Sequence, residues 1–157
     1  MPVGQKLVEV GDQAPEFELK NQHGQPVRLS SFRGRKAVLL VFYPFAFTGV
    51  CGGELHALEA ASAELAANGV ALLAISVDSM YAQRVFAERE GFSFPMLADF
   101  WPHGGVASAY GVLHEDAGVA RRGSFLVDVE GTVRWMVLNE IPDARDIDEV
   151  TKAMTAL

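Results

Sequence analysis

The sequence predicts a single α/β domain in which helices flank a central mixed sheet and an N-terminal β hairpin comes first. Residues 37–43 form a continuous apolar run rich in branched and aromatic residues, and residues 70–77 form a second run that is apolar except for Ser76, as expected of strands covered on both faces. A segment of helical composition follows each run, which favours parallel strands. A chain of 157 residues is about one domain long, so we expect one domain over 1–157.

The first predicted element is the hairpin, because residues 17–19 and 27–29 alternate apolar and polar side chains around the turn residues 21–24. The strand at 37–43 follows and ends at Pro44. No internal repeat, low-complexity segment or interdomain linker interrupts the chain.

The next helix is predicted from about Cys51 to Asn68, where Ala, Leu and Glu are frequent and Asn68-Gly69 is a C-terminal stop. Cys51 therefore lies near the N-terminus of that helix. The remaining predicted elements are a strand at 70–77, a helix at 79–90, a strand at 94–97, a short helix to Tyr110, a hairpin of strands 124–129 and 132–138, and a helix from about Asp143 to the end. This is a thioredoxin-like order of elements.

Composition and charge argue against several function classes. The formal net charge of −7 repels phosphate backbones, and the one basic cluster, at 33–36, is short, so we expect no nucleic-acid partner. No stretch approaches the roughly 18 to 20 apolar residues of a membrane helix, so we expect no membrane partner. The first 17 residues lack a signal or transit pattern, and we therefore expect a cytoplasmic protein.

Cys51 is the only cysteine, so it cannot form an internal disulfide and is a residue either of packing or of chemistry. The unpaired N–H groups at a helix N-terminus favour a thiolate and can lower a cysteine pKa from about 8.5 toward about 3.5 to 7.5. Gly52 and Gly53 leave the backbone beside the sulfur uncrowded, Thr48 adds a hydroxyl, and Pro44 ends the strand before it. These neighbours predict an approachable thiol.

The residues around Cys51 bear on three familiar functions of a cysteine: dithiol exchange, hydrolysis and metal binding. Dithiol exchange within the chain is excluded, because Glu54 stands where the second cysteine of such an enzyme would be. A cysteine hydrolase stays open: His56 lies off the Cys51 face of the helix, and His103 and His114 approach it only through folding. A metal site is disfavoured, since the cysteine and the four histidines show no paired ligand spacing.

The pattern Pro44-x-x-x-Thr48-x-x-Cys51 after an apolar strand, with Arg122 in the late segment RRGSF, resembles the active-site signature of the peroxiredoxins. Arg121 is the adjacent alternative, but the motif places the arginine directly before Gly-x-Phe. The resemblance covers essentially the whole chain. The segments FYPFAFTGVCGGEL, ADFWPHG and YGV look like the AhpE-type one-cysteine branch.

The resemblance implies a peroxidase in which Cys51 reduces hydrogen peroxide and organic hydroperoxides, with peroxynitrite as a further candidate. Cys51 would become a sulfenic acid, and an external thiol must reduce it because the chain has no second cysteine. The resemblance suggests mycothiol or another low-molecular-weight thiol, or a redoxin protein, as reductant. It also implies antioxidant function, no cofactor and a homodimer. A peroxide sensor that signals through the same sulfenic acid is the alternative.

Peroxide reduction needs groups that donate hydrogen bonds to both oxygens, because charge builds on the departing oxygen. Lowering the thiol pKa from about 8.5 to about 6 raises the thiolate near neutral pH only roughly fifteenfold, or about 1.6 kcal/mol. Thr48, Arg122 and the N–H groups of the helix start are therefore the expected donors, and Pro44 would shield the anion. The supporting residues are Tyr43 and Glu54, which orient donors, and Trp101, a packed or interface aromatic.

Each of these residues also has a purely structural interpretation. Pro44 would then only end a strand, and Thr48 would only cap the helix. Arg122 would be a surface cation, and Glu54 would complement the helix dipole. The joint spacing favours function for Pro44, Thr48 and Arg122.

Overall fold

The computed structural model describes residues 5–140, 147–155 and 157, and it describes only the backbone of Val50, Cys51 and Ile147. Its elements in chain order are β1 (Glu18–Lys20), β2 (Pro26–Arg28), a 3₁₀ helix (Leu29–Phe32), β3 (Ala37–Phe42), α1 (Gly49–Ala67), β4 (Val70–Ser76), α2 (Met80–Glu90), β5 (Met96–Ala98), α3 (Gly105–Ala109), β6 (Leu113–His114), β7 (Val119–Ala120), β8 (Arg122–Val127), β9 (Val133–Asn139) and α4 (Ile147–Met154). None of the described helices is both long and apolar enough to span a bilayer.

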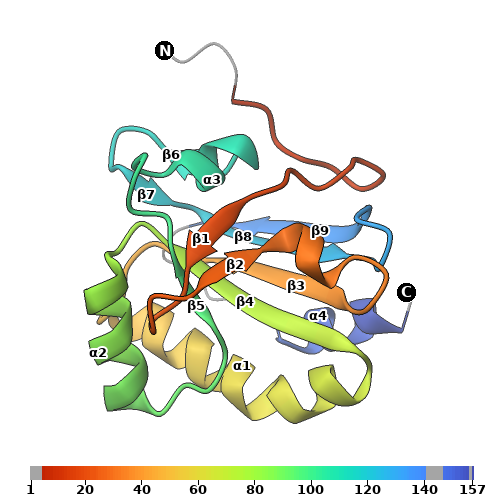
Figure 1. Cartoon of the computed structure of the whole chain (residues 1–157), viewed down its shortest axis with the longest axis horizontal. Coiled ribbons are helices and arrows are strands. Elements are labelled where there is room, and N and C mark those ends of the chain that lie inside the picture. Colours follow the sequence, from red (N-terminus) through yellow and green to blue (C-terminus); the bar gives the residue numbers. More distant parts are fainter. Residues whose placement is uncertain (1–4, 141–146, 156) are drawn as a thin grey trace.

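A seven-stranded mixed sheet forms the centre, with the strand order β2-β1-β5-β4-β3-β8-β9 (Figure 1). Strands β3, β4 and β5 are parallel, with Leu39 opposite Leu72 and Ile75 opposite Leu97. Strand β8 pairs antiparallel with β3, and β9 pairs antiparallel with β8. The mixed sheet flanked by helices confirms the predicted fold class, and the parallel strands confirm the expectation from the apolar runs.

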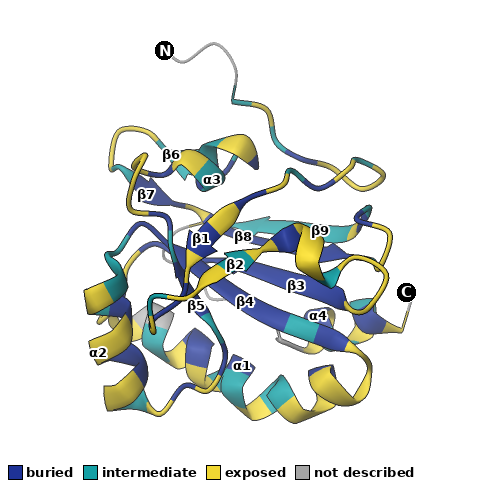
Figure 2. Cartoon of the chain, in the orientation of Figure 1, coloured by how far each residue is buried: buried dark blue, intermediate teal, exposed yellow. Residues whose placement is uncertain are grey.

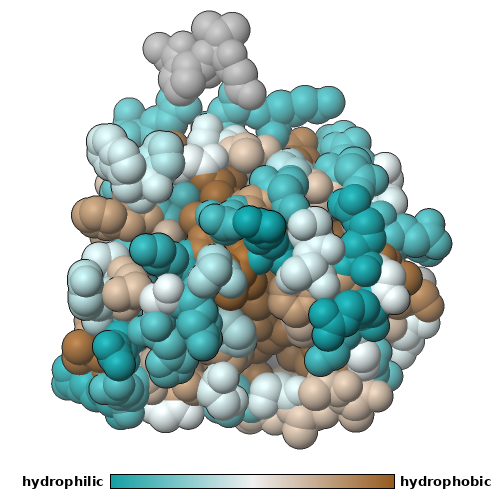
Figure 3. All heavy atoms as spheres, viewed as in Figure 1, coloured by the Kyte–Doolittle hydropathy of each residue, from teal (hydrophilic) through white to brown (hydrophobic). Residues whose placement is uncertain are grey.

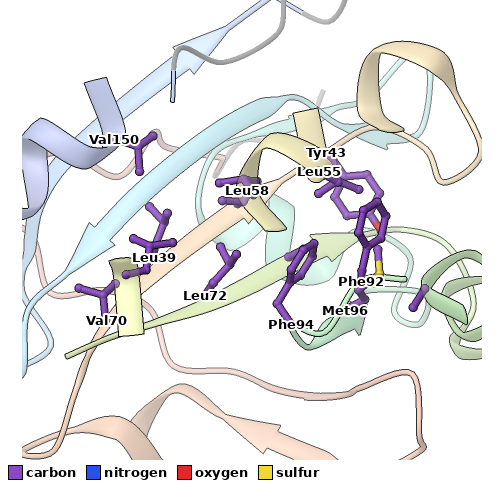
Figure 4. Close-up of a cluster of buried hydrophobic side chains, with 14 of the residues drawn as sticks. Leu39, Tyr43, Leu55, Leu58, Val70, Leu72, Phe92, Phe94, Met96 and Val150 are labelled. Carbon is purple, nitrogen blue, oxygen red and sulfur yellow. The ribbon is translucent and has the colours of Figure 1, made fainter. Parts of the chain in front are cut away.

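Each face of the sheet has its own hydrophobic core. Helices α1, α2 and α4 cover one face, where Leu39 of β3 packs among Leu58 and Val150 (Figure 4). On the other face, α3 and the N-terminal segment pack over the rings of Phe42 and Tyr110, whose centroids are 5.4 Å apart. All six residues of β3 are buried, as Figure 2 shows for the centre of the sheet. Hydrophilic residues cover much of the outer surface in the view of Figure 3.

Some boundaries differ from the prediction. Strand β5 begins at Met96, although Phe94 is buried, because Pro95 precedes it and has no N–H for a ladder. Strand β8 begins at Arg122 rather than Ser124, because its pairing with β9 extends to Asn139. The β6–β7 pair and the 3₁₀ helix were not predicted, since elements this short carry no periodic signal. The predicted start of the last helix, at 143, lies outside the described residues.

Helix α2 has a side-chain cap at its N-terminus, and its removal gives a testable prediction. The Ser79 hydroxyl accepts a hydrogen bond from the Ala82 N–H at 3.1 Å. Replacing Ser79 with alanine is expected to lower the free energy of unfolding by about 1 kcal/mol, measured by urea denaturation. The control is Ser62→Ala: Ser62 lies within α1 and donates to the Glu59 carbonyl, so its loss should cost less than about 0.5 kcal/mol. Equal losses would contradict the capping role.

Candidate active site

Cys51 is the third residue of α1, which follows the buried end of β3. Tyr43 and Pro44 are both buried and end the strand, and the helix begins five residues later at Gly49. No acidic residue lies in the first turn of α1, so nothing there offsets the partial positive charge of its free N–H groups. The backbone of Cys51 therefore has the predicted helix-start position, whereas the position of its thiol lies outside the described structure.

Thr48 is the N-cap residue of α1, with extended backbone angles φ −104° and ψ 151°. Its carbonyl accepts the first helical hydrogen bond from Gly52 at 2.8 Å. Its side chain does not cap the helix, because the hydroxyl donates to the Phe45 carbonyl at 3.2 Å. Thr48 is exposed, so the hydroxyl can also reach a small ligand. Capping through the side chain is thus not what this residue does.

Arg122 and Glu54 form a buried ion pair beside the helix start. Arg122 Nη1 donates to Glu54 Oε1 at 3.0 Å, and the two side chains are only 3% and 0% exposed. The interpretation of Arg122 as a surface cation is therefore wrong, whereas the neighbouring Arg121 is exposed. Glu54 lies beyond the first turn of α1 and faces the guanidinium, so complementing the helix dipole is not its main interaction. The pair joins α1 to β8 and fixes a positive charge near the turn of Cys51.

The Tyr43 hydroxyl donates to the side-chain oxygen of Gln83 in α2. Gln83 was not among the predicted site residues. A signal was present in the sequence: Gln83 is three residues before Phe86 and four before Ala87, both of which are buried, so it is a polar residue on the buried face of α2. Such a residue needs hydrogen-bond partners, and here they include the end of β3.

Trp101 is not brought together with the other predicted residues. Its side chain is 81% exposed, in the loop between β5 and α3, so within this chain it is not packed. The preceding Asp99 is the structured residue of this loop: its carboxylate accepts from the N–H groups of Val106 at 3.0 Å and Ala107 at 2.9 Å. Burial raises the pKa of Asp99, and these two hydrogen bonds act in the opposite direction.

The histidines that the hydrolase alternative requires have other partners. His56 bonds to the Glu90 carboxylate at 2.9 Å, and His103 bonds to the Gly118 carbonyl at 2.6 Å. The His114 Nδ1 accepts from the Ala117 N–H at 3.1 Å. These bonds engage His103 and His114 with residues outside α1, whereas a carboxylate partner such as Glu90 is also what a catalytic imidazole has, so the hydrolase alternative rests on His56 alone. Among the residues whose side chains are described, no group of three His, Asp or Glu forms a metal cluster.

An open pocket of about 280 Å³ lies beside the first turn of α1. Its walls include Thr48, Gly52, Gly53, Phe86 and Arg89. A Cβ atom at Gly52 or Gly53 would meet nothing within 4 Å, so the helix surface is open there. The turn that contains Cys51 is therefore bordered by space for a small molecule.

A thioredoxin-like sheet whose first crossover helix begins with a lone cysteine defines a protein of thiol-based redox chemistry. The model of the AhpC/TSA family matches residues 10–136. Alkyl hydroperoxide reductase E of Mycobacterium tuberculosis is 46% identical over 151 residues, which cover 96% of this chain and 99% of that protein. The chain belongs to the AhpC/TSA family and is a peroxiredoxin, which confirms the resemblance of its motifs.

Solved structures agree with this assignment. The reduced 2-Cys peroxiredoxin of Plasmodium vivax superposes with a TM-score of 0.85 at 32% identity, over 94% of this chain and 80% of that chain. AhpC of Enterococcus faecalis gives a TM-score of 0.86 at 30% identity, over 94% and 90% of the two chains. The chain is therefore a thiol-dependent peroxidase, an oxidoreductase that reduces peroxides.

Proposed function

We propose that this peroxidase reduces hydrogen peroxide and organic hydroperoxides, and peroxynitrite as a further substrate, by a one-cysteine mechanism. The observation that carries the proposal is the sole cysteine in the first turn of α1, beside the buried Arg122–Glu54 pair. The Cys51 thiolate attacks one peroxide oxygen and the O–O bond breaks. The departing oxygen takes a proton and leaves as water or an alcohol, or leaves as nitrite when the substrate is peroxynitrite, and Cys51 becomes a sulfenic acid.

Thr48 and Arg122 have complementary roles in this step. Thr48 was expected to donate to the peroxide, but its hydroxyl donates to the Phe45 carbonyl, so the proposed role is instead to accept from the O–H of the peroxide. The guanidinium of Arg122 carries several N–H donors, and one of them bonds to Glu54. A fixed cation that donates to the oxygens stabilises the negative charge that develops as the O–O bond lengthens. Buried Pro44 limits the access of water to the thiolate.

Recycling needs two external thiols, since Cys51 is the only cysteine. The first thiol displaces water from the sulfenic acid and forms a mixed disulfide with Cys51. The second attacks that disulfide, releases Cys51 as a thiol and leaves the two external sulfurs joined. A low-molecular-weight thiol such as mycothiol, or a redoxin protein, fits this cycle, and the open space over Gly52 and Gly53 supports an approach from that side.

We further propose that the protein is an antioxidant enzyme of the cytoplasm and that it forms a homodimer. Exposed aromatic side chains in the loop between β3 and α1 and in the loop after β5 support the proposal of a dimer. Phe45, Phe47 and Phe100 are 45 to 53% exposed, and Trp101 is 81% exposed. Exposed aromatics of this size are typical of interfaces between chains. Sedimentation of the reduced protein over a range of concentrations tests this part.

The first experiment mixes reduced protein with one equivalent of hydrogen peroxide and follows tryptophan fluorescence and intact mass. We expect rapid gain of one oxygen atom at Cys51 and no reaction in Cys51→Ser. Slow consumption of peroxide that persists in Cys51→Ser would contradict the peroxidase mechanism.

A second experiment separates the peroxidase from the peroxide sensor, which uses the same sulfenic acid. Steady-state peroxide reduction is measured with a panel of small thiols and with a thiol plus a redoxin. Sustained turnover supports the peroxidase. Oxidation of Cys51 without turnover under every condition favours the sensor.

A further inference from the structure

A chain of hydrogen bonds connects α2 and the end of β4 to the segment 43–46. Gln83 of α2 is 0% exposed, and its Oε1 accepts from the Tyr43 hydroxyl. Its Nε2 donates to the Ser76 hydroxyl oxygen at 2.9 Å and to the Leu97 carbonyl at 3.1 Å. All the hydrogen-bonding groups of this amide except one acceptor lone pair are thus used, which fixes the orientation of the side chain.

The other end of the chain is Asp78, in the turn between β4 and α2. The Ser76 hydroxyl donates to Asp78 Oδ2 at 2.6 Å, and the same oxygen accepts from the Ala46 N–H at 2.9 Å. One network therefore contacts the active-site segment at both of its ends, through Tyr43 and through Ala46. Between these two contacts lies Pro44, and two residues beyond them lies Thr48.

Packing around this segment is uneven. Phe45 and Phe47, on either side of buried Ala46, are 45% and 49% exposed, although the ring of Phe47 lies 5.0 Å from that of Phe86. Phe47 also has a φ of 65°, a left-handed backbone angle that is unfavourable for a residue with a bulky side chain. Such a conformation persists only where the surroundings impose it. The hydrogen bond from Ala46 to Asp78 lies next to this residue and supplies such a restraint.

We propose that Gln83 and Asp78 are positioning residues for peroxide reduction. They hold the segment that carries Pro44 and Thr48 so that the Thr48 hydroxyl lies within hydrogen-bond distance of the bound peroxide. The inference rests on the proposed function. Neither side chain is proposed to touch the peroxide: Asp78 acts through the Ala46 N–H, and Gln83 acts through the Tyr43 hydroxyl. The attack needs sulfur and both oxygens in line, and misplacing a group by about 1 Å can cost about 100-fold in rate.

The test compares two reactions of the same cysteine. Gln83→Leu removes the hydrogen bonds and keeps the approximate size of the side chain. We expect the second-order rate constant for Cys51 oxidation by hydrogen peroxide to fall about 10- to 100-fold, since Thr48 is displaced. Alkylation by iodoacetamide needs the thiolate but no aligned pair of oxygens, so its rate should change less than about threefold.

A matched control is Gln22, the other buried glutamine whose amide both donates and accepts a hydrogen bond. Gln22 donates from Nε2 to the Phe94 carbonyl at 3.1 Å and accepts at Oε1 from the Met96 N–H at 2.9 Å, outside the network. Gln22→Leu should destabilise the fold to a similar degree and leave the peroxide rate unchanged. At Asp78, alanine should slow the peroxide reaction, whereas asparagine, which keeps an oxygen acceptor, should retain most of it.

Hydrogen exchange at the Ala46 amide tests the restraint without peroxide. Asp78→Ala should accelerate this exchange at least tenfold, and Gln22→Leu should not. Unchanged exchange and peroxide rates in Asp78→Ala and Gln83→Leu would overturn the proposal, and so would equal losses of the peroxide and iodoacetamide rates. If the unaltered protein failed to react with peroxide, the proposed function would fail, and the exchange measurement alone would decide whether Asp78 fixes the segment.

Discussion

Replacing Arg122 with glutamine is expected to slow the oxidation of Cys51 by hydrogen peroxide by about 100- to 1,000-fold, or about 2.7 to 4 kcal/mol of transition-state stabilisation. The guanidinium is buried, and its N–H groups therefore act on the developing charge in a site of low dielectric, where they are stronger than in water. Glutamine keeps a neutral donor but removes the fixed positive charge. Single-turnover mixing of the reduced variant with peroxide measures the rate constant.

The control is the adjacent arginine, because Arg121 is exposed. Arg121→Gln should oxidise at the rate of the unaltered protein. Arg122→Lys keeps the charge but loses the planar arrangement of donors, and its rate should lie between the two. Circular dichroism establishes that each variant is folded. Similar rates for Arg121→Gln and Arg122→Gln would show that the assignment of the arginine is wrong.

Replacing Glu54 with alanine is expected to lower the free energy of unfolding by about 3 to 5 kcal/mol. The reason is that the Arg122 guanidinium would then be buried without the carboxylate that now lies 3.0 Å from it. This loss is a large part of the roughly 5 to 15 kcal/mol that stabilises a domain. Urea denaturation monitored by tryptophan fluorescence measures this loss of free energy. The variant Glu54→Gln keeps the shape of the side chain and removes only its charge.

An exposed ion pair provides the comparison. Glu18 pairs with Arg28 across the first hairpin, where the side chains are more than half exposed. Glu18→Ala should cost less than about 1 kcal/mol, because water replaces the lost partner. A similar loss at both positions would mean that burial does not determine the contribution of the Glu54 carboxylate.

The central fold could be predicted from local patterns. The apolar runs of β3 and β4 carry their own signal because both faces are covered, and a glycine in the αL conformation, Gly91, ends α2 next to the predicted boundary at residue 90. Elements whose length depends on a partner could not be placed as well. Strand β8 extends to Arg122 only because β9 continues opposite to it, and β6 exists only because β7 pairs with it.

The candidate site also contains some features that local sequence predicts and others that depend on distant partners. The positions of Thr48 and Cys51 relative to the helix start follow from the order of residues in one short segment. The contact between Glu54 and Arg122 joins residues 68 positions apart, and that between Tyr43 and Gln83 joins residues 40 apart, so no local spacing determines either. Asp78 was not predicted, because its bond to Ala46 arises only when the end of β4 lies beside the end of β3. Its bond to Ser76 is local, and a bond between residues two apart does not indicate a role at the site.

The glycines at the start of α1 have a consequence for the reduction of oxidised Cys51. Three of its first five residues are glycine, and each favours the helix by about 1 kcal/mol less than alanine would. The sixth residue, Glu54, is the first that is fixed to the body of the protein by a buried ion pair. We therefore expect local opening of the first turn to cost less free energy than opening beyond Glu54. We expect a bulky reductant to use such an opening, while the rest of the molecule remains folded.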